Sequence, residues 1–158
     1  MRTAIRVTEE WQRAGVHYVR TQAMCRGFQI PLEAEFGEDT PEDEYILILE
    51  GIYPVSTCRL HYLDEDTCKI ERVATLEEYR GQHYGKEAIL EAERWMAEKG
   101  ISKAVIHSRE AALGFYQKLG YVPDLSRAYG SGAFRCIYTE KNLSGSGQNG
   151  RQHHGKIV

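Results

Sequence analysis

Residues 67–99, TCKIERVATLEEYRGQHYGKEAILEAERWMAEK, change their hydrophobic period halfway along, and this change decides the fold. The first ten residues alternate between two faces, which predicts a β-strand over 67–76. From Gly85 to Lys99 the apolar residues recur at helical spacing, and Gly100 supplies the helix stop. The stretch therefore predicts a strand that passes through a glycine-containing turn into an amphipathic helix.

Upstream of this stretch, the sequence predicts a strand over 3–7 and then a helix that runs from an N-cap at Thr8 to about Met24. Two apolar runs follow. They predict strands that form an antiparallel three-stranded meander with the strand already described, over 45–49, 55–63 and 67–76.

An acidic segment separates the first helix from the meander. Residues 33–44 hold seven acids and no Lys or Arg, and Gly37 and Pro41 among them predict a loop. Its negative charge is compatible with steering of a cationic amine. A solvated loop is the simpler interpretation and is the one favoured here, because acidic loops are common.

Downstream of the long helix, a second strand–helix–strand pattern follows, with strands over 101–107 and 133–139, another beginning at Tyr121, and a helix over 110–119. This order predicts a partly parallel sheet. The fold class is therefore α/β (α+β): a mixed, mostly antiparallel sheet flanked by helices on both faces. We expect one domain over 1–143, and a disordered Gly/Ser-rich tail over 144–158 of the kind that cloning adds.

Composition excludes several classes of protein. The 158 residues carry a net charge of -3, whereas nucleic-acid and membrane-surface binders usually carry a basic excess. No apolar stretch approaches the roughly 20 residues of a membrane helix. The four cysteines are widely spaced, which predicts reduced thiols, a cytoplasmic location and no metal site.

The turn YRGQHYGK, residues 79–86, is the part of the sequence that most clearly indicates chemistry. A turn that opens a helix presents unpaired backbone N–H groups at the positive end of the helix dipole, and Arg80 and Lys86 add charge. These features predict a cradle for a diphosphate. Gly81 and Gly85 stand one residue too close for a P-loop, and G-x-G-x-x-G is absent, which leaves coenzyme A.

At these residues the chain resembles the GNAT superfamily of N-acetyltransferases. Arg80 and Gly85 match the first and last positions of its motif A, Arg/Gln-x-x-Gly-x-Gly/Ala, while His83 replaces the middle glycine. Residues 111–121, AALGFYQKLGY, resemble motif B, and residues 19–35 resemble a small bacterial-type subgroup. The resemblance spans about residues 45–142.

The resemblance implies transfer of an acetyl group from acetyl-CoA to a primary amine by direct attack, with acetyl-CoA as co-substrate. It assigns the diphosphate to the backbone amides of the turn, namely Gly81, Gln82, His83, Tyr84, Gly85 and Lys86, with Arg80 nearby. The pantetheine arm is assigned to Val73, Ala74 and Thr75, where one amide also polarises the thioester carbonyl. The His83 side chain is expected to point outward.

Two residues are predicted to move protons. Tyr116 occupies the motif B position of a tyrosine that protonates the departing thiolate, although its spacing from Ala112 and Leu119 also suits a core aromatic. Glu71, placed on the face of Val73 by strand alternation, is the candidate base; an ion-paired strand glutamate is the alternative. His107 is a second candidate base, and His17 and His61 have weaker claims.

Two other functions stay open at this stage: an acyl-CoA-binding module without transferase activity, and an interaction protein on the same fold. The expected partner is a small-molecule or peptide amine, with neither nucleic acid nor membrane, and a homodimer is compatible with the sequence. The sequence does not identify the amine.

Overall fold

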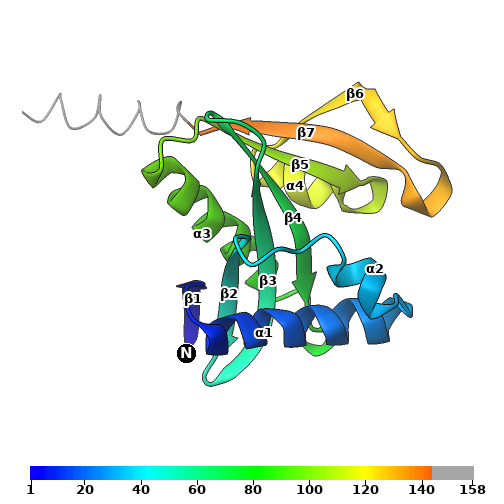
Figure 1. The fold of residues 1–158 in the computed structure, drawn as a ribbon. Coiled ribbons are helices and arrows are strands. Elements are labelled where there is room, and N and C mark those ends of the chain that lie inside the picture. Colours follow the sequence, from blue (N-terminus) through cyan, green and yellow to red (C-terminus); the bar gives the residue numbers. More distant parts are fainter. Residues whose placement is uncertain (144–158) are drawn as a thin grey trace, which may run out of the picture. The chain divides into compact units, whose positions relative to one another are not determined.

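The chain folds into a mixed seven-stranded sheet with helices packed on it, seen in a computed structural model that describes residues 1–143 (Figure 1). The strands are β1 (Arg2–Arg6), β2 (Glu44–Glu50), β3 (Tyr53–Tyr62), β4 (Thr67–Thr75), β5 (Lys103–Arg109), β6 (Val122–Tyr129) and β7 (Cys136–Asn142). The α-helices are α1 (Glu10–Arg20), α2 (Leu32–Phe36), α3 (Tyr84–Glu98) and α4 (Leu113–Lys118).

The order of the strands is β1-β2-β3-β4-β5-β7-β6. β4 and β5 pair in parallel, while β1–β2, β2–β3, β5–β7 and β6–β7 pair antiparallel. The mixed, mostly antiparallel sheet predicted from the sequence is therefore confirmed. The chain divides into two compact units: residues 1–61 with 70–95, and residues 62–69 with those from 96 onward.

In the first unit, α1 and α3 cover opposite faces of the sheet. Val16 and Val19 of α1 are buried in one cluster with Tyr45 and Leu47 of β2. Ile46, between those two in β2, points to the other face together with its partner Cys58 of β3, which donates a 3.6 Å hydrogen bond to the carbonyl oxygen of Ala88 in α3. Figure 1 shows α1 lying across the strands.

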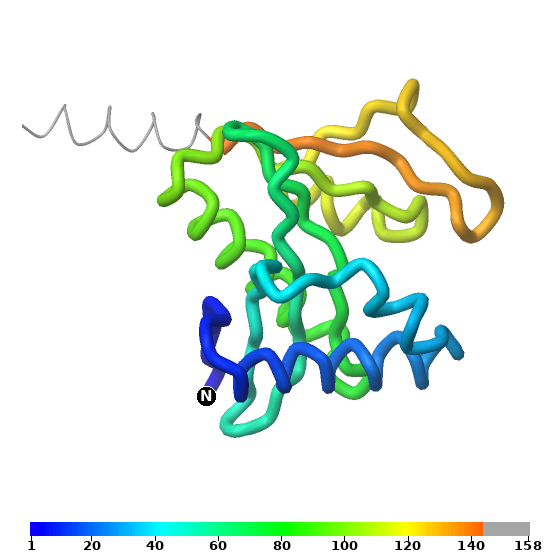
Figure 2. Tube along the Cα trace, viewed as in Figure 1, coloured from blue at the N-terminus to red at the C-terminus, as the bar shows by residue number. Residues whose placement is uncertain are grey.

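The segment between α1 and β2 is more ordered than the predicted loop. Thr21–Arg26 continues α1 as a π-helix, and Leu32–Phe36 forms α2. Glu35 of α2 is buried at 1% exposure. Figure 2 shows the chain after α2 turning back across β4 and β3 before it enters β2. The prediction of a solvated acidic loop is therefore wrong for Glu35, Asp39 and Asp43, which pair with buried arginines, whereas Glu33, Glu38 and Glu42 are exposed.

Two helix ends differ from the sequence prediction for local reasons. Glu9, and not Thr8, is the N-cap of α1, and it forms a capping box with Gln12. At the end of α3, Gly100 has φ 84° and Ile101 donates its N–H to the carbonyl of Met96. Ile101 therefore completes the helix stop, and β5 begins two residues later than predicted.

In the second unit, α4 packs with β5 and β6. The predicted helix over 110–119 is a 3₁₀ turn (Glu110–Ala112) followed by α4. The strand predicted over 133–139 begins only at Cys136, because Gly130 and Gly132 have positive φ and a 3₁₀ turn (Gly132–Phe134) precedes it. The predicted tail, 144–158, lies outside the described residues.

Within residues 1–143, the helices are too short or too polar to cross a bilayer.

Candidate active site

The turn between β4 and α3 presents backbone N–H groups at the start of a helix. A 3₁₀ turn (Glu77–Tyr79) follows β4, Gly81 has φ 78°, and α3 begins at Tyr84. The first intrahelical hydrogen bond is donated by Glu87 to the carbonyl of His83, at 3.1 Å. The N–H groups of the three residues before Glu87 therefore have no carbonyl one turn earlier, and they lie at the positive end of the helix dipole.

His83 occupies a position whose backbone favours glycine. Its φ of 69° lies in the left-handed region, which costs an L-residue about 1–2 kcal/mol. Its side chain is exposed. With histidine in place of the motif glycine, the backbone of the turn therefore still has a glycine-like conformation. The outward direction of the His83 side chain stays a prediction.

Arg80 ties the turn to the end of β4. Its Nε donates to the carbonyl oxygen of Thr75 at 3.1 Å, and its guanidinium lies 6.0 Å from the ring of Phe28. A cavity of about 590 Å³ opens beside the turn, with Arg80, Phe28 and Tyr18 among its walls. The cationic side chain that the sequence placed at the cradle is thus held there by a backbone bond.

Tyr84 contributes its backbone to the turn, while its side chain is part of the core. The residue is 4% exposed, and its hydroxyl donates to Glu50 at 3.2 Å. Arg2 stacks 3.8 Å above the Tyr84 ring, and Tyr79 meets the same ring edge-on at 5.6 Å. These contacts fix the first residue of α3, and with it the direction of the N–H groups that follow.

Strand β4 is interrupted just before the residues predicted to bind pantetheine. Arg72 has φ 51°, a left-handed conformation that an extended strand does not contain. Ile70 and Ala74 are buried, whereas Arg72 between them is partly exposed. With a left-handed residue between them, strand spacing alone does not place Glu71 and Val73 on one face.

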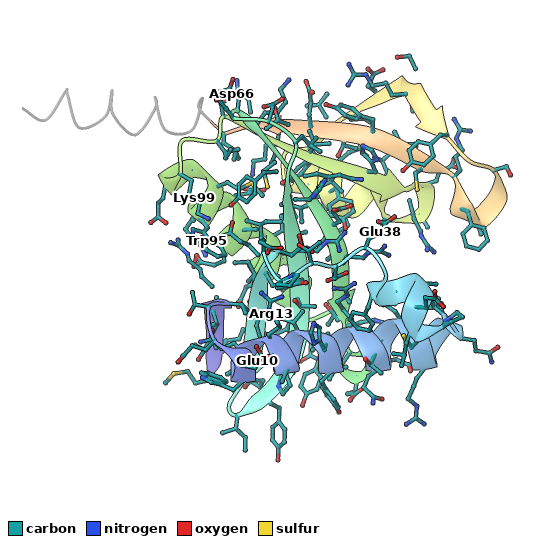
Figure 3. All side chains as sticks on the ribbon, in the orientation of Figure 1. Glu10, Arg13, Glu38, Asp66, Trp95 and Lys99 are labelled. Atoms are coloured by element: carbon teal, nitrogen blue, oxygen red, sulfur yellow. The ribbon has the colours of Figure 1, made fainter. Side chains whose placement is uncertain are left out.

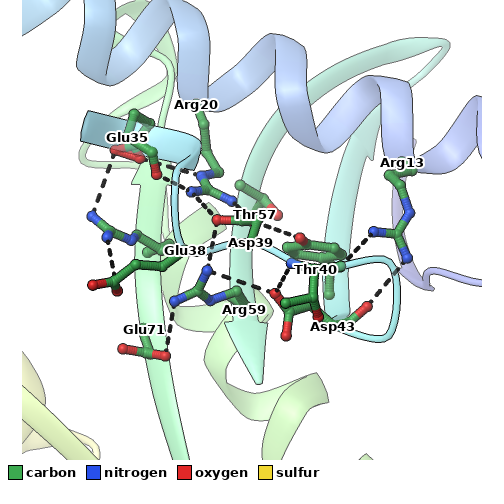
Figure 4. Close-up of polar contacts among 12 residues, drawn as sticks. Arg13, Arg20, Glu35, Glu38, Asp39, Thr40, Asp43, Thr57, Arg59 and Glu71 are labelled. Carbon is green, nitrogen blue, oxygen red and sulfur yellow. Dashed lines mark hydrogen bonds and ion pairs between the residues drawn. The ribbon is translucent and has the colours of Figure 1, made fainter. Parts of the chain in front are cut away.

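A buried charge network connects β4 to the acidic segment (Figure 4). Arg20 is fully buried and binds Asp39 through two nitrogens, at 2.6 and 3.0 Å. It also donates to the Glu35 carboxylate at 3.3 Å. Because both Arg20 and Glu35 are withdrawn from water, removing either partner would leave a buried charge, which typically costs 3–5 kcal/mol.

Arg59 of β3 is the second centre of this network and is 3% exposed. Its Nη1 donates to Asp39 at 2.6 Å and lies 3.7 Å from Asp43, and its Nη2 donates to Glu71 at 3.0 Å. Glu71 is thus ion-paired, as the alternative interpretation of the sequence had it. Whether it also acts as a base stays a prediction.

One donor in the network has no partner. Arg59 Nε is buried and makes no hydrogen bond, the single such side-chain nitrogen or oxygen found among residues 1–143. An unsatisfied buried donor typically costs about 1–3 kcal/mol. The carboxylate partners therefore set the position of this guanidinium, although one of its N–H groups makes no hydrogen bond.

Arg72 extends the network toward the surface. Its guanidinium lies 3.9 Å from Glu35 and 3.8 Å from Glu38, and Glu38, labelled in Figure 3, is well exposed. The ion pairs described so far join three arginines (Arg20, Arg59 and Arg72) to five carboxylates (Glu35, Glu38, Asp39, Asp43 and Glu71). The network therefore has an excess of negative charge.

The network shifts the protonation of its members. Burial raises the pKa of Asp39, but hydrogen bonds from Arg20 and Tyr45 outweigh burial and hold this pKa below its usual value. Burial, and then the hydrogen bond to Asp39, raise the pKa of Tyr45. Burial, followed by the charges of Arg20 and Arg13, lowers the pKa of His17, which favours a neutral imidazole at pH 7.

The remaining catalytic candidates lie in the second unit. Tyr116 of α4 is 8% exposed, and its ring meets the rings of Phe115 and Tyr121 edge-on, at 5.1 and 6.2 Å. His107 of β5 shares a 3.1 Å hydrogen bond through Nδ1 with the hydroxyl of Tyr129. The structure thus places Glu71, Val73, Thr75 and the turn in the first unit. Tyr116 and His107 lie in the second unit.

Arg20, Arg59 and Asp39 were not predicted from the sequence. A signal was present for two of them: Arg59 is the one Lys, Arg, Asp or Glu in the predicted strand VSTCRLHYL, and Arg20 follows Val19 on the helix face that is buried. An arginine at an inward position requires a buried carboxylate partner. The acidic segment, which offers seven carboxylates, was the place to look for that partner.

Comparison with known proteins identifies the relatives of this chain. A family model described as the acetyltransferase (GNAT) family matches residues 4–121. The uncharacterized protein YyaT of Bacillus subtilis is 39% identical over 55% of this chain, and the match spans 60% of YyaT. The crystal structure of an N-acetyltransferase candidate from Lactobacillus plantarum is similar with a TM-score of 0.82 and 26% identity, covering 90% of this chain and 98% of the other.

A second solved structure contains the co-substrate. It is a GNAT family acetyltransferase from Elizabethkingia anophelis with acetyl-CoA bound, and it shares the fold with a TM-score of 0.66 and 16% identity. That match covers 89% of this chain and 97% of the other.

Proposed function

This chain belongs to the GNAT family of acetyltransferases, and from that premise we propose that it transfers an acetyl group from acetyl-CoA to a primary amine by direct attack. The observation that carries the proposal is the turn from Arg80 to Lys86, which opens α3 with unpaired N–H groups. A helix N-terminus of this kind suits the diphosphate of a coenzyme A thioester.

The residues of the turn fit that group. A Cβ added to Gly81 would meet no atom within 4 Å, so the backbone there is open to an approaching ligand. We assign the diphosphate to the amides of Gly81, Gln82, His83, Tyr84, Gly85 and Lys86, with Arg80 beside them. The break at Arg72 precedes Val73, Ala74 and Thr75, which we assign to the pantetheine arm and to polarisation of the thioester carbonyl.

The chemistry requires two proton transfers. An alkylamine with a pKa near 10.4 is protonated at pH 7, so a base must free its lone pair before the nitrogen attacks the thioester carbon. We assign this role to Glu71, acting through water, with His107 as the alternative. As the carbon–sulfur bond breaks, the thiolate takes a proton, and we assign that proton to the hydroxyl of Tyr116.

The charge network supports a cationic acceptor. Five carboxylates face three arginines beside β4, and Glu9, Glu10 and Asp39 border a cavity of about 830 Å³ next to α1. A negative field of this kind raises the local concentration of cations. We propose on this ground that the acceptor is an amine, either a small molecule or a peptide.

The same proposal includes the organisation and location of the protein. Residues 1–143 would act as one acetyltransferase domain. The four cysteines are free thiols, which supports the cytoplasm as their compartment. A homodimer stays a prediction.

The test is release of free CoA thiol from acetyl-CoA in the presence of cadaverine, spermidine, phenethylamine or alaninamide, followed by mass spectrometry of the amine. We expect at least one amine to gain a single acetyl group. Binding of acetyl-CoA with no acetylated amine across a wider panel would favour the acyl-CoA-binding module instead.

A further inference from the structure

We propose that Arg59 is a positioning residue of the acetyl transfer, which holds the Glu71 carboxylate in place while Asp39 fixes Arg59 from the opposite side. This inference rests on the proposed function, in which Glu71 takes the proton of the acceptor amine. It states which residue orients the Glu71 carboxylate, and so goes beyond the assignment of Glu71 as the base.

The backbone next to Glu71 departs from regular strand geometry. The next residue, Arg72, has φ 51°, so the regular pleat of β4 ends there. In an unbroken strand, the pleat itself would direct the side chain toward one face. Where the pleat is broken, a side-chain bond helps to set the direction of the Glu71 carboxylate.

Arg59 supplies a side-chain bond of this kind. Arg59 Nη2 donates to Glu71 Oε1 at 3.0 Å, and Arg59 Nη1 donates to Asp39 Oδ1 at 2.6 Å. The Glu71 side chain keeps 18% exposure, whereas that of Arg59 keeps 4%. The guanidinium is thus the buried support, and the carboxylate is the part that reaches the surface.

The Arg59 guanidinium keeps one unsatisfied donor. Arg59 Nε has no hydrogen-bond partner, although it is buried. Buried polar groups in folded proteins are nearly always paired, so an exception needs an explanation. Holding Glu71 and Asp39 at once fixes the guanidinium plane and leaves Nε without an acceptor.

The experiment compares Arg59→Lys with Arg20→Lys, which is a matched control. Both arginines are buried and both bind Asp39, but the bond to Glu71 comes from Arg59. Rates are measured with the amine that releases CoA fastest. For Arg59→Lys we expect kcat to fall roughly 10- to 100-fold, the range for a misplaced group, and its pH profile to shift. KM for acetyl-CoA should stay within about twofold. Arg20→Lys should lower the melting temperature without shifting the pH profile.

A double-mutant cycle separates positioning from general damage. Glu71→Gln keeps an acceptor for Arg59 and removes the base. On this background, Arg59→Lys should lower kcat no further, since its effect acts through Glu71. Independent losses that multiply would overturn the inference, as would equal pH shifts in the two arginine variants. If Arg59→Lys does not fold, Asp39→Asn replaces it in the cycle with the same two outcomes.

A measurement without turnover tests the contact itself. In a crystal structure of Arg59→Lys, the Glu71 carboxylate should leave the position that it has in the wild type, and an unchanged position overturns the inference. The proposed function has a separate test. It is contradicted if the wild type acetylates no amine, and the positioning role is then contradicted as well.

Discussion

Tyr116 offers the most direct test of catalysis at the scale of one residue, because its ring and its hydroxyl have separable roles. The ring packs between Phe115 and Tyr121, and Tyr116→Phe keeps that packing. If the hydroxyl protonates the thiolate, turnover should fall roughly 10²-fold, within the usual range for a general acid. Binding of acetyl-CoA, measured by calorimetry, should change little.

Tyr121→Phe is the control for this variant, since it removes a hydroxyl from the neighbouring buried ring. It should keep turnover within about twofold of the wild type. Tyr116→Phe with wild-type turnover and an unchanged pH profile would move Tyr116 from the catalytic residues to the core.

His17 predicts how stability depends on pH. Its pKa is lowered in the folded state, by burial first and then by Arg20 and Arg13, from a value of about 6.5 in the unfolded chain. Below that pH the unfolded state takes up the proton more readily, so stability falls as the pH drops from about 6.5 toward 5. Asp39 titrates at lower pH, because its own pKa is held down.

The measurement is the melting temperature of the wild type and of His17→Gln at pH 7 and pH 5. The wild type should lose more than the variant, because glutamine has no proton to take up. Equal losses in the two proteins would contradict the assignment to His17.

At the scale of an element, the start of α3 is where the cradle can be closed. Gly85 lies in the first turn of the helix, beside the N–H groups assigned to the diphosphate. Gly85→Glu adds bulk and a repelling charge, so acetyl-CoA affinity should fall at least tenfold, about 1.4 kcal/mol, by calorimetry. The helix itself should form, since glutamate is a better helix former than glycine.

Ala97→Glu is the control at the other end of the same helix, where the side chain is exposed. It introduces the same residue far from the helix N-terminus and should leave affinity within about twofold. Equal binding by Gly85→Glu and Ala97→Glu would place the diphosphate elsewhere.

For the whole molecule, the prediction concerns linkage between binding and folding. A ligand that binds only the native state stabilises it by about 2.7 kcal/mol at 100 times its Kd. For a chain of 158 residues this should raise the melting temperature by roughly 5–10 °C. Calorimetric scans with acetyl-CoA should show this rise in the wild type and a smaller one in Gly85→Glu; no rise in the wild type would contradict coenzyme A binding.

The buried face of α1 illustrates where sequence reasoning fails within a correct element. Helical spacing predicted this helix from Trp11, Ala14, Tyr18 and Val19, and the helix is present. Trp11 and Tyr18 are nevertheless 58% and 49% exposed, while the charged Arg20 is fully buried. Hydrophobic spacing gives the period of a helix, but the face that is buried depends on which partners the rest of the chain brings to it.

The sequence by itself determined the strand, turn and helix from Thr67 to Glu98, and with them the family, because period and motif are properties of neighbouring residues. Only the tertiary structure decided the left-handed backbone at Arg72 and the bonds from Arg59 to Asp39 and Glu71. Asp39 lies 20 residues before Arg59, and Glu71 lies 12 residues after it, on three different segments of the chain. Such contacts form only when those segments close on one another, and the free energy of burying their charges depends on the packing around them.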